Sequence, residues 1–144
     1  MPVIGLTSIR AKSAAVANNI VNVKAQRAAT AGSATGQAFA ALLTPIDTSN
    51  LINSMFRRLR NDRHGWRAVV GYTAAYAFAV HNAKGTLKGQ PRRHFGVTKS
   101  GVEFGGGTGN GNYWDPNAEP RFLEKGFEQN RGAIHEAVVR ALRL

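Results

Sequence analysis

The residue types that most often carry out chemistry are present in this chain, but their spacing indicates no catalytic or metal site. The four histidines lie far apart, and none has a second potential ligand three or four residues away: His64, His81, His94 and His135. Most of the eight acidic residues have a turn or helix-end role available, so no carboxylate pair for acid–base catalysis is evident. The chain has no cysteine, which excludes thiolate catalysis and cysteine-ligated metals. We therefore expect no enzyme activity and no cofactor.

The glycine-rich stretch 105–112, with the sequence GGGTGNGN, is the segment that most suggests a phosphate cradle. A P-loop needs a lysine and then Ser or Thr directly after its last glycine, followed by a helix. Here Tyr113, Trp114, Asp115 and Pro116 follow instead, and these are residues typical of a loop. The sequence favours a flexible loop tip over a nucleotide site.

The charge of the chain indicates an acidic partner. Nineteen Lys and Arg against eight Asp and Glu give a formal net charge of +11, which suits nucleic acid or an acidic protein surface. Arginines alternate with aromatic residues at 56–66 and 91–95, a pattern compatible with either partner. A solvated basic surface with no dedicated partner is the plain alternative. The candidate interface cations are Arg57, Arg58, Arg92 and Arg93.

The length of 144 residues and a hydrophobic content of 43% indicate a single folded domain. Composition divides it into a helical arm (1–43), a corner with a β-sheet (44–82), an extended loop or hairpin (83–117) and a C-terminal helix (118–144). No apolar run approaches eighteen residues, so we expect no membrane partner. The N-terminus lacks the pattern of a secretory signal, which predicts synthesis in the cytoplasm.

The arm carries one narrow apolar stripe, formed at helical spacing by Ile9, Val16, Ile20 and Val23. Two glycines within residues 31–36 predict a weak point, followed by a second short helix at 37–43. The stripe suits packing on a neighbouring helix or subunit, and an ordinary core-facing helix is the open alternative.

Between the arm and the C-terminal helix, the pattern changes to that of a sheet. Residues 44–54 have turn and cap chemistry, and two β-type runs at 55–60 and 66–72 flank a turn, as in a hairpin. Residues 76–82 form a further apolar run, strand or short helix, and a second small hairpin is expected around 98–101. From Pro120 the spacing predicts one amphipathic helix of roughly twenty residues. The expected core is Leu51, Met55, Trp66, Val69, Tyr76, Val80, Phe122, Leu123 and Phe127.

These elements predict an α+β fold, in which a small antiparallel β-sheet packs against a long N-terminal helix and a C-terminal helix, with a long loop or hairpin insertion.

Three short segments carry spaced motifs. Residues 44–54 (TPIDTSNLINS) are similar to T-P-x-D-T-G-x-L-x-x-S, and residues 70–82 (VGYTAAYAFAVHN) are similar to V-G-x-x-x-x-Y-A-x-x-V-x-x-G. Residues 119–127 (EPRFLEKGF) are similar to P-x-x-F-L-x-x-A/G-F. In this order, the three motifs resemble the signatures of one family, the tail-completion or neck proteins of tailed bacteriophages. Ser49 stands where the family has glycine, so positive φ is not required there, and Asn82 stands near another usual glycine.

The resemblance implies a structural, non-enzymatic protein of the virion, at the joint between head and tail. Family members form a ring, for which six-fold symmetry is favoured and twelve-fold is the alternative. The implied partners are a head-side connector or adaptor and a tail-tube or tail-terminator protein, with DNA passing through the centre. A basic nucleic-acid-binding domain is the alternative function.

The residues expected to act divide into two sets. Candidates for contacts with subunits or neck partners are the stripe, the four arginines named above and four loop aromatics: Phe95, Phe104, Tyr113 and Trp114. Those expected to hold the family-like corner are Pro45, Asp47, Thr48, Leu51, Gly71, Tyr76, Pro120, Phe122 and Leu123.

Overall fold

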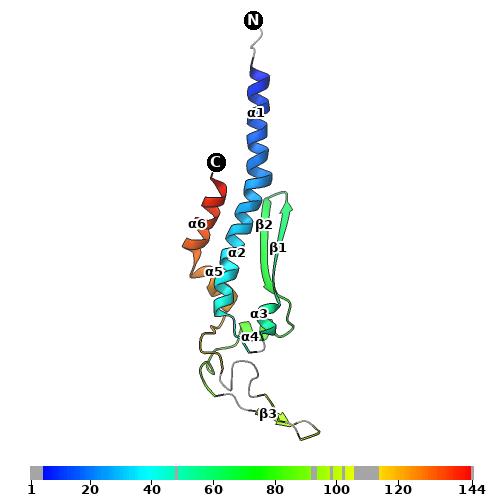
Figure 1. Cartoon of the computed structure of the whole chain (residues 1–144), viewed down its shortest axis with the longest axis vertical. Coiled ribbons are helices and arrows are strands. Elements are labelled where there is room, and N and C mark those ends of the chain that lie inside the picture. The colour runs from blue at the N-terminus through cyan, green and yellow to red at the C-terminus, as the bar shows by residue number, and fades with distance from the viewer. Residues whose placement is uncertain are drawn as a thin grey trace.

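The computed structural model confirms an α+β fold, with a long N-terminal helix, a two-stranded antiparallel sheet and C-terminal helices. A central helix lies between a β-hairpin on one side and the C-terminal helices on the other (Figure 1). The structure describes residues 5–47, 49–91, 94–97, 99–101, 103–105 and 114–143, with the backbone alone at 94–96 and 103–105.

The N-terminal helix runs without a break from α1 (Leu6–Asn19) through a π-helical turn, η1 (Ile20–Lys24), into α2 (Ala25–Leu43) (Figure 1). The predicted weak point at residues 31–36 is therefore wrong. A Cβ on Gly32 would lie 2.7 Å from a methyl of Val138, and one on Gly36 would lie 2.3 Å from the ring of Phe127. These glycines serve close packing of the C-terminal helices, which outweighs their poor helix propensity.

The predicted hairpin is confirmed as β1 (Met55–Asp62) and β2 (Gly65–Tyr72), paired from Met55↔Tyr72 to Asp62↔Gly65. Partners across the ladder share a face, and β2 lies against α2. Val69 pairs with Arg58 and is 42% exposed, so its assignment to the core is wrong. The alternation of side chains in this strand puts Val69 on the outer face, whereas Ala68 and Val70 are half-buried.

The buried core is small and centres on Phe122, which is 1% exposed. Leu51 of α3 (Asn50–Asn53) and Ala77 of α4 (Ala77–His81) complete it. Half-buried residues packed around this cluster are Leu43, Tyr72, Ala74, Val80 and Leu123. The rings of Tyr72 and His81 meet Phe122 edge-on, at centroid distances of 5.2 and 4.9 Å.

Outside that cluster, the expected core residues are less buried. Met55, Trp66 and Phe127 are half-buried. Tyr76 is 44% exposed, which contradicts its prediction as a core residue. It precedes α4 at the N-cap position, and the helix turns the following residue, Ala77, into the core instead.

The C-terminal segment is two helices, α5 (Phe122–Glu128) and α6 (Arg131–Leu142), and the prediction of one continuous helix is wrong. The backbone leaves helical geometry at Asn130 (φ −115°, ψ 23°), whose side-chain amide donates to the carbonyl of Gly126 (3.0 Å). The break allows both helices to lie against α2. Each of them meets α2 at a position where a glycine allows close approach.

The second predicted hairpin is confirmed as β3 (His94–Val97) and β4 (Glu103–Gly105), which form a separate antiparallel sheet. Residues 84–90 lead to it along the body of the protein. The backbone there pairs with Trp114, whose carbonyl accepts from Gly89 (3.0 Å) and whose amide donates to the carbonyl of Gln90 (2.9 Å).

The chain is elongated (Figure 1). Its accessible surface of 10329 Å² compares with about 7,200 Å² for a compact monomer of its mass. The exposed helix α1, which extends beyond the small core, contributes to this excess.

Candidate assembly surfaces

The three family-like segments meet at one end of α2. Asp115, four residues before the third segment, joins the chain there to the corner, since its Oδ2 accepts from the backbone amide of Ile46 (2.9 Å). The amide of Arg121 donates to the carbonyl of His81 (2.8 Å), and the amide of Glu119 donates to that of Leu43 (3.0 Å). Segments up to about eighty residues apart in sequence are thereby tied together around Phe122.

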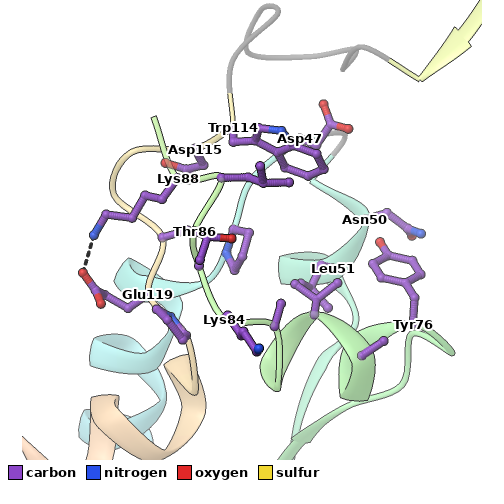
Figure 2. Close-up of a pocket in the computed structure, with 18 of the residues that line it drawn as sticks. Asp47, Asn50, Leu51, Tyr76, Lys84, Thr86, Lys88, Trp114, Asp115 and Glu119 are labelled. Carbon is purple, nitrogen blue, oxygen red and sulfur yellow. Dashed lines mark hydrogen bonds and ion pairs between the residues drawn. The ribbon is translucent and has the colours of Figure 1, made fainter. Parts of the chain in front are cut away.

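A cavity of about 520 Å³ opens at this junction, and we call it the corner groove. Figure 2 shows Leu51 and Tyr76 on one side of it and Lys88 and Glu119 on the other. The residues of the predicted corner set that line it are Pro45, Asp47, Leu51, Tyr76 and Pro120. Thr48 lies outside the described residues. Trp114, predicted as an interface residue, is half-buried and also lines this groove.

Glu119 joins two elements at the edge of the corner groove. Its carboxylate accepts from Lys88 Nζ (2.5 Å), drawn as a dashed line in Figure 2, and from Lys125 Nζ (3.0 Å). These hydrogen bonds hold the pKa of Glu119 below its ordinary value. The pair with Lys88 ties residues 84–90 to the start of α5.

Ser49 has φ 61°, in the left-handed region. The expectation that serine removes the need for positive φ at this position is therefore wrong. Ser49 directly precedes α3, and this backbone is costly for a residue with a Cβ. The signature's glycine is the residue best suited to such a turn.

A buried polar pair closes the junction from the side of the sheet. The Thr44 hydroxyl is bonded to the Ala40 carbonyl (2.8 Å) and to the Tyr72 hydroxyl (2.6 Å). Thr44 is fully buried, and burial raises the pKa of Tyr72, an effect that the bond to Thr44 partly offsets. Gly71, next along the strand, lies under the ring of Phe56, which a Cβ there would approach to 2.9 Å.

The arm is the most exposed apolar element among the described residues. We use the word arm from here for α1 and η1, because no residue of either is buried. Two hydrogen bonds hold the base of the arm. The hairpin supplies one, since Trp66 Nε1 donates to the carbonyl of Val21 (3.2 Å). The other runs to the C-terminal end of the chain, where Lys24 Nζ donates to the carbonyl of Arg143 (2.5 Å). The predicted stripe is exposed along its whole length, at Ile9, Val16, Ile20 and Val23. Two further apolar residues of the arm, Leu6 and Val21, are exposed as well. The alternative of an ordinary core-facing helix does not hold for this stretch within a single chain.

A second groove runs along α2, between β2 and the C-terminal helices, and we call it the lateral groove. Its volume is about 790 Å³. The floor consists of small residues of α2: Ala28, Ala29, Gly32 and Ser33. The walls are mainly apolar: Trp66, Ala68 and Val70 from β2, and Leu123, Phe127, Ile134 and Val138 from α5 and α6.

Arginines project from the hairpin. Arg57 and Arg58, both predicted to be interface residues, are exposed, and the Arg58 guanidinium lies 5.2 Å from the ring centroid of Phe56. Arg67 pairs with Asp62 (3.5 Å). Arg92, Arg93 and Tyr113 lie outside the described residues, as do the side chains of Phe95 and Phe104.

Within the part of the chain that the structure describes, no three His, Asp or Glu side chains gather as metal ligands would. No described helix combines the length and apolar character needed to cross a bilayer. No protein-family model, curated protein or solved structure matches the chain.

Sequence reasoning missed the lateral groove and the bridging role of Glu119. Both combine residues from segments distant in sequence. The one local signal for the groove was the run of small residues in α2, which reads as a helix weakness until a partner helix is known.

Proposed function

We propose that the protein is a structural subunit of the joint between head and tail of a tailed bacteriophage. Copies assemble into a ring, six-fold rather than twelve-fold, between the head-side connector or adaptor and the tail-tube or tail-terminator protein. DNA passes through the centre of the ring. The protein acts by shape and by its interfaces, without catalysis, as part of the virion.

One observation supports this proposal most directly. The three segments that resemble neck-protein signatures are separate along the sequence, yet they share one junction in space. They meet around one buried residue, Phe122, and one groove. Signatures that maintain a common corner are what a shared architecture requires.

The arm supports the oligomeric part of the proposal. An extended helix with exposed Ile9 and Val16 needs a partner to remove these side chains from water. A ring supplies one to every copy, whereas an isolated monomer supplies none.

Light scattering and negative-stain microscopy of the purified full-length chain test the assembly. We expect a discrete mass of several subunits and closed rings with an open centre. The functional test adds this protein to phage heads and tails that were assembled without it, and joined particles are the expected result. A monomer at high micromolar concentration, or rings that leave heads and tails separate, would contradict the proposal.

The arginines of the hairpin favour a second candidate, a nucleic-acid-binding domain. Arg58, Arg60 and Arg67 lie on its outer face, where phosphates can reach them. Binding to short duplex DNA, measured against salt concentration, separates the two functions. Nanomolar binding in dilute buffer with a steep loss in salt would favour this candidate, and weak binding together with ring formation would favour the neck protein.

A further inference from the structure

We propose that the arm of each copy lies in the lateral groove of a second copy. This exchange builds on the ring proposed above and names the surfaces that would join its subunits. The inference follows from the shape of the arm, the shape of the groove and the charges on each.

The arm presents a seam suited to another helix. Ile9, Val16 and Val23 are spaced by seven residues, the repeat of helices that pack along their length. Leu6 and Ile20 lie fourteen residues apart on the adjoining row, with Ser13 midway between them, and we call these five apolar residues the seam. All five are exposed. The nineteen residues of the arm span about 28 Å.

The arm cannot reach the groove of its own chain without breaking the helix. It continues α2 through η1 in nearly the same direction, and α1 extends past the end of α6 (Figure 1). The bonds from Trp66 and Lys24 hold its base in that position. The partner must therefore be another molecule.

The lateral groove has the form that a helix requires. Its two apolar walls stand on either side of α2, and α6 already covers part of the floor, since a Cβ on Gly32 would lie 2.7 Å from Val138. An arm would therefore lie across the opening between the walls. Its apolar side chains would meet apolar walls on both sides, as in other helix-in-groove complexes.

Charge favours the groove over a second arm as the partner. Arg10 and Lys12 flank the seam, and residues 1–46 contain no acidic residue. Two arms packed together would place these cations against one another, which disfavours that pairing. Glu124 and Glu128 line the lateral groove. Glu124 pairs with Arg121, whereas Glu128 has no ion-pair partner among the described residues.

The other charged residues that line the groove leave its net charge negative. Arg67 also lines it, but Asp62 lies 3.5 Å from its guanidinium. His81 lines it at the lower end, with its ring against Phe122. A basic arm thus meets a groove whose uncompensated charge is that of Glu128.

An arm and a groove are different surfaces, so the contact is heterologous. Each copy gives one arm and receives another, and such contacts close into a ring or continue as a filament. Every copy in a closed ring would have its seam covered and its groove filled.

Crosslinking from the arm tests the exchange directly. The chain has no cysteine, so Val16→Cys creates a single attachment site for a benzophenone in the full-length protein. This protein is mixed with unmodified protein that is labelled with nitrogen-15. The mixture is irradiated, and the crosslinked residues are mapped by mass spectrometry. We expect crosslinks from the unlabelled copy that carries the probe to residues 66–70 or 123–138 of the nitrogen-15-labelled copy. Asn18→Cys carries the same probe on the opposite side of the arm and should give a several-fold lower yield.

Any other crosslinking pattern overturns the proposal. Crosslinks to the arm of another copy would show arm pairing, crosslinks within one chain would show folding back, and equal yields from both positions would show no oriented contact. Rings with crosslinks elsewhere would reject the exchange but keep the neck function. Crosslinks in the groove without closed rings would keep the exchange and reject the neck function.

A pair of charge variants provides a second readout. Val16→Glu places a carboxylate in the seam and should raise the concentration needed for assembly by about tenfold or more. Asn18→Glu adds the same charge on the opposite face and should leave assembly nearly unchanged, while circular dichroism checks that both helices remain formed. Glu128→Lys should weaken assembly, and Arg10→Glu combined with Lys12→Glu in the same chain should restore part of it. Equal effects of the two arm variants, or no rescue, would contradict the exchange.

Discussion

The two halves of the N-terminal helix have opposite relations to the rest of the chain. In α2, the helices α5 and α6 approach closely at Gly32, Gly36 and Ala40, and every buried residue is small: Ala28, Gly32, Ser33, Gly36 and Ala40. In α1, no residue is buried, and the larger residues Ile9 and Val16 face water. One half offers a smooth surface that its own chain covers, and the other offers projecting side chains that its own chain leaves uncovered. The difference separates what folds the subunit from what would join it to others.

The largest effect is expected at the centre of the body. Phe122→Ala should lower the free energy of unfolding by about 3–5 kcal/mol, because it removes a fully buried ring from between Tyr72 and His81. Phe78→Ala is the control, since Phe78 is 81% exposed and should change stability by less than about 0.5 kcal/mol. Urea titration of both variants measures the difference. Similar losses in the two would mean that the core does not centre on Phe122.

The close approach of helices in the body is tested by two glycines of the C-terminal segment. A Cβ on Gly126 would lie 2.5 Å from backbone atoms of Ala40, so Gly126→Ala should cost about 2 kcal/mol. Gly132 of α6 has nothing within 4 Å of that position, and Gly132→Ala should stabilise by about 0.5–1 kcal/mol. Thermal unfolding, monitored by circular dichroism, shows whether each variant is stabilised or destabilised. Stabilisation by both would show that α5 does not pack closely on α2.

These glycines also show how far the sequence alone reaches. Alternating and helical spacings are local, so the hairpin, the arm stripe and the helical character of the C-terminus could be predicted from them. Helix propensity alone predicts a weak point at Gly32 and Gly36, because it does not take a partner helix into account. Alternation groups Val69 with Arg58 on one face but does not say which face α2 covers.

The candidate surfaces divide in the same way. The arm stripe was predictable because it lies within one helix. The lateral groove was not, because its floor and walls come from three segments. The left-handed backbone at position 49 could not be predicted from serine, because only the glycine of the family signature indicates such a backbone directly.

That turn provides an intermediate effect. Ser49→Gly should stabilise the protein by about 1 kcal/mol, because glycine adopts φ 61° without the steric cost of a Cβ. The greater flexibility of glycine in the unfolded chain offsets part of the gain. Chemical denaturation measures the change, and Ser54→Gly is a control at negative φ. Destabilisation by Ser49→Gly would mean that the corner does not hold this backbone.

A smaller effect is expected at the acidic edge of the body. The pKa of Glu119 is lowered in the folded state, so its contribution is present at neutral pH and is lost as pH falls below the ordinary value of 4.5. Glu119→Gln should cost less than about 1 kcal/mol at neutral pH, because the carboxylate is about a third exposed. The stability of the Glu119→Gln variant should also fall less steeply than that of the parent protein as the pH is lowered. Glu136→Gln, at an exposed position of α6, is the control and should leave the acid profile unchanged.

The smallest effect is expected in the arm, and it should depend on concentration. In dilute solution, where single chains dominate, Val16→Ala should leave the midpoint of thermal unfolding almost unchanged, because Val16 is exposed and alanine favours a helix. At concentrations that support assembly, the parent should gain stability from association while the variant gains less. Differential scanning calorimetry over a range of protein concentrations separates the two regimes. A concentration-independent loss would mean that Val16 already packs within its own chain, and the contrast between the two halves of the helix would then be wrong.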